Sequence, residues 1–522
     1  FRFKTRRPRG GFVENIYVER VRANVKRQAL YCDMLGSARW VGELAQRYPA
    51  REITPLTPWF ANISIHDVEI TGCSTLVDVS ALPEKPVKNF FFGNVKAHCD
   101  RIGKICDATK FSMKDVRIES CDTVMRIDNC DYASFFGFSN VTTGSSVKIE
   151  KTGGECRYLN VQTYPLVPVN YQSIRPGEVW LDTEGKPIQA HGFQVTFREG
   201  KYYWYGEDKT HTLFGTNRMF GGVRCYSSTD FYNWKDEGRI IEPATDPHSP
   251  LHHCQKLERP HILYCAKTGR YVCWLKSQSN DGHFVILEAE HFMGPYHFVR
   301  NLKPNGFAVG DFDMYADPDT GKGYVWFERP HWEQICAELS DDYTNVNGRY
   351  SEHFVGKVPP FTREAAAHFV MDGKHYIYTS GTTSYTPNPS EVAVFDDYHG
   401  EYTVLGNPHI GDEYAHSFCS QITSVIKIPG KDLYVAMADR WLPHTNKTDI
   451  PKKDWQSFLT RYKDHRPYPK DFATPKVADR FYTLVNPNQD VYKATYVFLP
   501  IVVKDGIPMI EWKDEWKLEN YE

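Results

Sequence analysis

The chain has 522 residues, which is more than one ordinary hydrophobic core can hold and predicts at least two domains. Its 62 lysines and arginines against 65 aspartates and glutamates give a net charge of -3, so global electrostatics argue against a nucleic-acid-binding protein. No apolar run reaches the length of a membrane span, so we expect none. The 13 cysteines are scattered, with no Cys-x-x-Cys pair, and indicate neither a zinc site nor a disulfide framework.

Residues 1–165 carry a repeat in which Asn, Asp or Arg precedes Val. From Val68 onward the steps between these valines are 27, 21, 25 and 20 residues, the length of one coil of a parallel β-solenoid. We expect each coil to direct a Phe and a Val inward, and a β-sandwich with irregular strands is the alternative. The repeated pairs are Arg20-Val21, Asp67-Val68, Asn94-Val95, Asp115-Val116, Asn140-Val141 and Asn160-Val161. The expected inward pairs are Phe91 with Val95, Phe111 with Val116, and Phe136 with Val141.

The opening residues, Arg2-Phe3-Lys4-Thr5 followed by residues 10–18, resemble the C-terminal part of glycoside hydrolase family 28, the polygalacturonase-type enzymes. The resemblance implies a right-handed parallel β-helix in which Arg2 and Lys4 contribute to a polyanion-binding cleft. That family's catalytic aspartates lie upstream of this element, and residues 1–165 do not supply them, so we expect a partial β-helix without its acids. For Arg2 and Lys4, with Arg6, Arg7 and Arg9, a solvated basic end is the alternative. No signal peptide is visible in the opening residues.

Residues 166–522 change in character, with short alternating strands and Gly, Asp or Asn turns from Glu178 onward. Three acidic motifs recur at intervals of roughly fifty residues or more, which favours a radial β-propeller over a sandwich, because successive blades then point carboxylates into one central pocket. The motifs are Glu258-Arg259-Pro260, Asp313-Met314 and Arg363-Glu364-Ala365. The expected strands are 194–197, 202–205, 223–227, 261–264, 271–274, 284–288, 324–327, 369–371, 375–379 and 433–437.

Several motifs in this half resemble glycoside hydrolase family 43, and most of all its exo-β-1,3-galactanase branch, over about residues 170–517. The resemblance implies a five-bladed β-propeller and an inverting, single-displacement glycosidase. The matching segments are 177–183, 188–192, 202–207, 226–228, 258–260, 294–295, 313–314, 363–365, 420–421 and 439–441.

An inverting glycosidase needs a protonated carboxyl beside the glycosidic oxygen and a base that activates water on the other face of the sugar. By the resemblance, Glu364 is the general acid and Asp313 orients it and tunes its pKa. Asp311, two residues earlier on the same strand face, competes with Asp313. Glu258 matches an acceptor for sugar hydroxyls, and an ion pair at a strand start is its alternative.

The base is less evident, because residues 188–194 contain no carboxylate where most of family 43 has an aspartate. The galactanase branch shares that absence, and there a glutamine holds the attacking water, which Gln421 matches. A neutral amide is a poor base, so Gln421 is expected to position water, with Glu207 as the alternative base. Phe193 stands where the branch usually has a second glycine, so we expect a ring close to the sugar.

Pyranose rings stack on aromatic side chains, so Tyr205, Tyr385 and Trp441 are candidate platforms, and His191 and Gln194 are candidate hydroxyl contacts. His211 and the pair His252-His253 show no metal-ligand spacing, so we expect no catalytic metal and no cofactor. The family resemblance is compatible with a structural calcium in the propeller.

The sequence therefore predicts an all-β, extracytoplasmic enzyme whose partner is an oligo- or polysaccharide. The activity we expect is inverting, exo-acting release of galactose from β-1,3-linked galactan of plant arabinogalactan or pectin side chains. An α-L-arabinofuranosidase or β-xylosidase is the alternative within the family. A glycan-binding pseudoenzyme is the alternative outside catalysis, because the base is missing.

Overall fold

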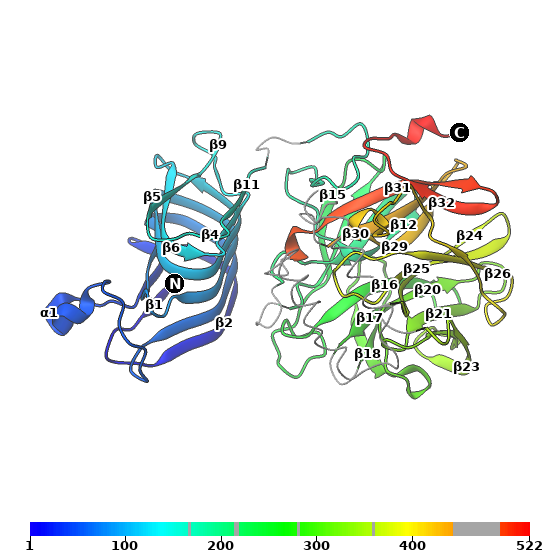
Figure 1. Cartoon of the computed structure of the whole chain (residues 1–522), viewed down its shortest axis with the longest axis horizontal. Coiled ribbons are helices and arrows are strands. Elements are labelled where there is room, and N and C mark those ends of the chain that lie inside the picture. Colours follow the sequence, from blue (N-terminus) through cyan, green and yellow to red (C-terminus); the bar gives the residue numbers. More distant parts are fainter. Residues whose placement is uncertain (165–168, 213–218, 279–281, 358–360, 442–490) are drawn as a thin grey trace. The chain divides into compact units, whose positions relative to one another are not determined.

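The computed structural model describes residues 1–164, 169–212, 219–278, 282–357, 361–441 and 491–522 (Figure 1). These residues form two compact units, one built mainly from Phe1–Val169 and the other mainly from Asn170 to Glu522. The domain boundary expected between residues 165 and 166 lies outside the described residues. Within the described ranges, no helix is long and apolar enough to cross a membrane.

The first unit is a sheet in which successive coils pair in parallel, as a β-solenoid requires. Val21 pairs with Val68, and Val68 pairs with Val95, so the repeated valines are in register. The strands are β1 (Arg2–Lys4), β2 (Phe12–Asn24), β3 (Gln28–Asp33), β4 (Trp59–Ser80), β5 (Val87–Glu119), β6 (Val124–Asp131), β7 (Ser134–Phe136), β8 (Ser139–Asn140), β9 (Ser145–Ser146), β10 (Lys148–Gly153) and β11 (Asn160–Gln162). Two short helical segments, α1 (Ala38–Val41) and η1 (Gly42–Ala45), follow β3.

The polar residue of each early repeat makes a left-handed backbone corner. Arg20, Asp67, Asn94 and Asp115 have φ of 54°, 55°, 46° and 51°. Short polar side chains tolerate this conformation, and Asn94 Nδ2 also donates a hydrogen bond to Asp67 Oδ1 at 2.5 Å. The repeat therefore marks the corners at which the coils turn.

The last two repeats do not behave in this way. Phe91, Val95, Phe111 and Val116 are buried, as expected, but Val141 is 54% exposed. The expected inward direction of Val141 is wrong because Val141 lies in the turn between β8 and β9, which pair antiparallel.

The basic N-terminal end is only partly solvated. Arg7 is buried and forms an ion pair with Glu84 at 2.6 Å, which excludes it from a solvated basic end. Lys4 lies 3.9 Å from Asp33, and the Arg2 guanidinium lies over the Tyr31 ring. Binding of a polyanion by Arg2 and Lys4 stays a prediction.

The second unit is a five-bladed β-propeller, as predicted (Figure 1). The innermost strands of consecutive blades contact one another, and the innermost strand of the last blade contacts that of the first, which closes the ring. Blade one is β12 (His191–Arg198), β13 (Lys201–Glu207), β14 (Val223–Ser228) and β15 (Lys235–Ile241). Blade two is β16 (Leu257–Cys265), β17 (Arg270–Ser277), β18 (His283–Ala289) and β19 (His297–Leu302).

Blade three is β20 (Phe312–Ala316), β21 (Gly323–Glu328), β22 (Gln334–Leu339) and β23 (Val346–His353). Blade four is β24 (Arg363–Met371), β25 (Lys374–Gly381), β26 (Glu391–Phe395) and β27 (Thr403–Gly406). Blade five is β29 (Gln421–Lys427), β30 (Tyr434–Arg440), β31 (Thr495–Lys504) and β32 (Ile507–Glu511), with β28 (His409–Ile410) beside β32. Short 3-10 turns are η2 (Pro304–Gly306), η3 (Ser417–Cys419), η5 (Val491–Lys493) and η6 (Leu518–Asn520).

Aromatic side chains fill the space between the first and last blades. Phe193 is fully buried and packs against Trp204, Tyr496 and Phe498 with ring centroids 5.1–5.7 Å apart. The Phe193 ring therefore points into the core between the blades, and the expectation that it lies close to the sugar is wrong. Successive side chains of a strand point to opposite faces, so the residues on either side of Phe193 point away from this core.

Candidate active site

The propeller repeats one structural position in every blade, where the innermost strand begins beside the end of the second strand. Antiparallel pairing brings these two strand ends together, and ring closure brings the five positions around one axis. The paired residues are His191 with Glu207, Glu258 with Lys276, Glu364 with Ser380, and Gln421 with Asp439. In blade three the position belongs to Asp311, whose carbonyl accepts the Glu328 N–H at 2.9 Å.

β-Bulges aim several of these side chains. The register shifts directly after His191, Glu258 and Glu364, and the next residues, Gly192, Arg259 and Ala365, have φ of 53°, 52° and 49°. Left-handed backbone costs a non-glycine residue roughly 1–2 kcal/mol, and such bulges commonly redirect side chains beside active sites. Glycine is required in blade one, because a Cβ at Gly192 would lie 2.4 Å from Glu207 Oε1.

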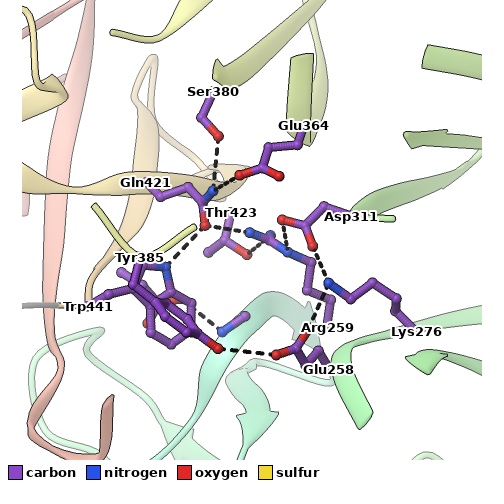
Figure 2. Close-up of polar contacts among 12 residues, drawn as sticks. Glu258, Arg259, Lys276, Asp311, Glu364, Ser380, Tyr385, Gln421, Thr423 and Trp441 are labelled. Carbon is purple, nitrogen blue, oxygen red and sulfur yellow. Dashed lines mark hydrogen bonds and ion pairs between the residues drawn. The ribbon is translucent and has the colours of Figure 1, made fainter. Parts of the chain in front are cut away.

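A small pocket of about 90 Å³ opens at this end of the inner strands. Figure 2 shows Glu364 and Gln421 on one side of it, Glu258 and Tyr385 on the other, and Arg259 between them. The described lining consists of Glu207, Lys256, Glu258, Arg259, Lys276, Gln278, Asp311, Glu364, Ser384, Tyr385, Gln421 and Trp441.

Hydrogen bonds define the orientation of the Gln421 amide (Figure 2). Its Oε1 accepts from Arg259 Nη2 at 2.7 Å and from Trp441 Nε1 at 3.0 Å. Its Nε2 donates to Ser380 Oγ at 2.9 Å and to Glu364 Oε1 at 3.3 Å. Because guanidinium and indole N–H groups only donate, the amide oxygen must face them and the NH₂ must face Glu364.

The surroundings of Glu364 favour its protonated form. Burial, followed by the nearby carboxylates of Asp311 and Glu328, raises the pKa of Glu364 well above its usual range. A carboxyl that keeps its proton near neutral pH can protonate a departing oxygen.

Glu258 has the opposite electrostatic environment. Burial opposes its ionisation, but Lys276, Lys256 and Lys209 bring the pKa of Glu258 well below its usual range. Lys276 Nζ lies 2.7 Å from Glu258 Oε2 and 2.6 Å from Asp311 Oδ1. The Tyr385 hydroxyl donates to Glu258 Oε1 at 3.2 Å. Glu258 is thus an ionised acceptor, which suits contacts with sugar hydroxyls.

The two aspartates of blade three have different surroundings. Asp311 lines the pocket, 2.8 Å from Arg259 Nε, and its charge contributes to the raised pKa of Glu364. Asp313 is not among the described lining residues: it lies 3.1 Å from His261 and accepts the backbone N–H of His368 at 2.6 Å. Asp313 therefore ties three inner strands together, whereas Asp311 has the effect on the Glu364 pKa that we predicted for Asp313. Orientation of Glu364 by Asp313 stays a prediction.

The other predicted site residues also fall into two groups, those that line the pocket and those that do not. Glu207, Tyr385 and Trp441 line the pocket, whereas His191, Gln194 and Tyr205 are not among its described lining residues. His191 is fully buried between Asp439, at 2.8 Å, and the Tyr496 ring. The Tyr205 hydroxyl accepts the Ile262 N–H at 3.0 Å within the blade core, and Gln194 Nε2 lies 3.2 Å from His261.

Arg259, Lys276 and Lys256 had no role in the sequence-based site, although they surround its carboxylates. Two signals could have found part of this set. The spacing from Glu258 to Asp311 equals that from Asp311 to Glu364, which marks Asp311 as the equivalent position. Lys276 lies at the end of the strand that pairs with the Glu258 strand.

Outside the pocket, His252, His253 and Cys254 bring their ligand atoms within 4.8 Å of one another, so these neighbours are the described residues of this unit that could hold a metal ion. The sequence analysis did not identify this possible metal site, because the pair His252-His253 shows no metal-ligand spacing.

One carboxyl group that favours its protonated form and others that favour the ionised form surround the same propeller pocket. Glycoside hydrolases use such a combination to break a glycosidic bond. The model of the glycosyl hydrolases family 43 matches residues 193–424. The matched range lies within the propeller unit, so this unit is similar to glycoside hydrolase family 43.

Solved structures agree with this family. A family 43 β-1,3-galactosidase has 27% identity and a TM-score of 0.54, with 67% of this chain and 65% of that chain covered. The chain thus spans less than two thirds of that relative. A second family 43 β-1,3-galactosidase, solved with galactodeoxynojirimycin, has 27% identity and a TM-score of 0.53, with 66% of this chain and 100% of that chain covered. An exo-β-1,3-galactanase from Clostridium thermocellum has 25% identity and a TM-score of 0.50, with 66% of each covered. No curated protein sequence matches the chain.

Proposed function

We propose that the protein is an inverting, exo-acting glycoside hydrolase that releases galactose from β-1,3-linked galactan or galacto-oligosaccharides. Plant arabinogalactan and pectin side chains are the polymers that would supply such a substrate, and an enzyme acting on them would work outside the cytoplasm. The likeness to two β-1,3-galactosidases supports the sugar and the linkage.

The observation that carries the proposal is that the pKa of Glu364 is raised in the same pocket in which the pKa values of Glu258 and Asp311 are lowered. In this proposal Glu364 donates its proton to the glycosidic oxygen as the bond to the anomeric carbon breaks. Asp311 stays ionised, because Arg259 and Lys276 outweigh burial and lower its pKa. The ionised Asp311 in turn disfavours ionisation of Glu364.

The water must attack the other face of the sugar, and two carboxyls that act in this way stand roughly 6.5–9.5 Å apart. Gln421 is in hydrogen-bond contact with Glu364, so it positions the sugar or the water rather than forming such a spaced pair. Glu207 is the alternative base. Burial raises its pKa, with Lys209 opposing, which brings it toward the value that a base at neutral pH needs.

Product analysis tests the substrate. The protein is incubated with β-1,3-galactobiose, arabino-oligosaccharides and xylobiose, and we expect galactose as the product. Arabinose or xylose would instead indicate an α-L-arabinofuranosidase or β-xylosidase. Calorimetric binding of galactobiose without release of any sugar would indicate a glycan-binding pseudoenzyme.

Proton NMR of the first-formed galactose tests the stereochemistry. A single displacement on a β-linked substrate produces the α-anomer first. If the β-anomer appeared first, a carboxylate would have formed a covalent intermediate, and the single-displacement proposal would fail.

A further inference from the structure

The segment that leads into Gln421 has an unusual backbone. Ser417, Phe418 and Cys419, which form η3, have φ of 54°, 55° and 58°, and Ala415 has φ of 50°. None of these residues is a glycine. At roughly 1–2 kcal/mol for each left-handed residue, such a turn persists only if other contacts hold it.

One buried carboxylate supplies several of these contacts. Asp412 Oδ2 accepts the backbone N–H groups of His416 at 2.7 Å and Ser417 at 2.6 Å. Asp412 Oδ1 lies 2.9 Å from His416 Nδ1. Burial opposes the charge on His416, but the hydrogen bond with Asp412 raises the pKa of His416 to about 9. The ion pair therefore persists at neutral pH.

Two further contacts fasten the turn to neighbouring strands. The fully buried Ser417 hydroxyl donates to the Asn388 carbonyl at 2.7 Å and accepts the Ser390 N–H at 2.9 Å. Arg440 Nη2 donates to the Phe418 carbonyl at 2.8 Å. The turn is thus fixed to the loop before β26 and to the end of β30.

Packing alone does not hold this segment, because a hollow of about 280 Å³ lies beside it. Asp412, His416, Phe418, Cys419 and Arg440 all line that hollow. Hydrogen bonds and the ion pair must replace the packing contacts that a filled core would provide.

We propose that Asp412 and His416 are positioning residues that hold the left-handed turn so that Gln421 enters the pocket with its amide oxygen toward Arg259 and its NH₂ toward Glu364. The inference rests on the proposed function, since it assigns a role in that site. Loss of Asp412 frees the turn to relax, which displaces Gln421 from the start of β29. Displacement by about 1 Å can cost about 100-fold in rate.

The test compares Asp412→Ala, Asp412→Asn and His416→Gln with the control Asp432→Ala, which removes an exposed carboxylate from the hairpin turn after β29. For Asp412→Ala we expect kcat on β-1,3-galactobiose to fall about 10- to 100-fold with KM changed less. Asp412→Asn should recover part of the loss, because an amide oxygen still accepts backbone N–H bonds. His416→Gln should lie between wild type and Asp412→Ala.

Hydrogen exchange separates failure of this inference from failure of the proposed function. We expect the amides of residues 416–421 to exchange faster in Asp412→Ala than in wild type or Asp432→Ala, whatever the substrate is. Galactodeoxynojirimycin binding, measured by calorimetry, should weaken in the same variant. Unchanged exchange in a folded Asp412→Ala protein, or an equal loss of kcat in Asp432→Ala, would overturn the inference. If wild type released no galactose but the exchange still rose, only the proposed function would fail.

Discussion

Glu258 and Glu364 occupy the same structural position in two blades, and they are held in opposite charge states. Each is the second residue of an innermost strand, and each precedes a left-handed bulge residue. Three lysines surround Glu258 and lower its pKa, whereas burial and two carboxylates raise the pKa of Glu364. The position in the blade therefore directs a carboxyl toward the pocket, and the charged side chains around it decide whether the acid or the anion is favoured. For Glu258 the lysine with the largest effect, Lys276, lies in the same blade, whereas the carboxylates that act on Glu364 lie in blade three.

Removing the acid should have one of the two largest effects on turnover. We expect Glu364→Gln to lower kcat on β-1,3-galactobiose by about 100- to 1,000-fold or more, the scale of general-acid catalysis. An aryl galactoside with a good leaving group needs less protonation and should lose less. The matched change Glu258→Gln should lower activity on both substrates by the same factor. If Glu364→Gln lowered kcat by the same factor on both substrates, the assignment of Glu364 as the acid would be contradicted.

Removing the amide beside the acid tests the water-positioning role. Gln421→Ala should abolish measurable turnover without unfolding the propeller, because Arg259 and Trp441 lose their shared acceptor but keep their packing. Glu207→Gln is the comparison: if Glu207 is the base, it will be the more damaging change. Circular dichroism and steady-state kinetics of both variants decide between them.

Removing the Lys276 cation should make the pKa values of Glu258 and Glu364 more alike and should destabilise the fold. Lys276→Met leaves Glu258 and Asp311 without their shared, buried partner, and breaking a buried ion pair costs about 3–5 kcal/mol. We expect a clear drop in the thermal unfolding midpoint. Lys322→Met is the control, since Lys322 is half-exposed and its pair with Glu338 should contribute less than about 1 kcal/mol. Equal midpoints for the two variants would show that the site's charges are screened by solvent.

The smallest expected effect is a pH dependence of stability with opposite signs. Glu364 has a folded-state pKa above its unfolded value of about 4.3, so the wild type loses stability as pH rises from there toward the folded value. The stability of Glu364→Gln relative to wild type should therefore increase as pH rises. Glu258 has a depressed pKa, so its contribution is present above about pH 4.3 and is lost in acid as pH falls through the folded value. Glu258→Gln should be less stable than wild type at neutral pH, and the difference should shrink in acid. Thermal midpoints across pH measure both trends.

Much of the fold could be predicted because its signals are local. Alternating strands and recurring acidic motifs indicated a propeller, and the spaced Asn-Val and Asp-Val pairs indicated the coils, since left-handed corners favour those residues. The prediction failed at Val141, which lies in the turn between the antiparallel strands β8 and β9. It also failed at Phe193, where packing against Tyr496 and Phe498 from the last blade decides the direction of the ring.

The sequence by itself, through its motifs and their resemblance to family 43, singled out Glu258, Glu364 and Gln421 as site residues, because those motifs consist of neighbouring residues. Only the tertiary structure decided that Asp311 and not Asp313 faces the pocket, that Glu364 keeps its proton and Glu258 does not, and that Arg259 orients Gln421. Those outcomes depend on groups that strand pairing within a blade brings together, as with Lys276 and Glu258, and on groups that closure of the ring brings together, as with Arg259 and Gln421. Electrostatic interactions act through space, so neither set can be identified from neighbouring residues in the sequence.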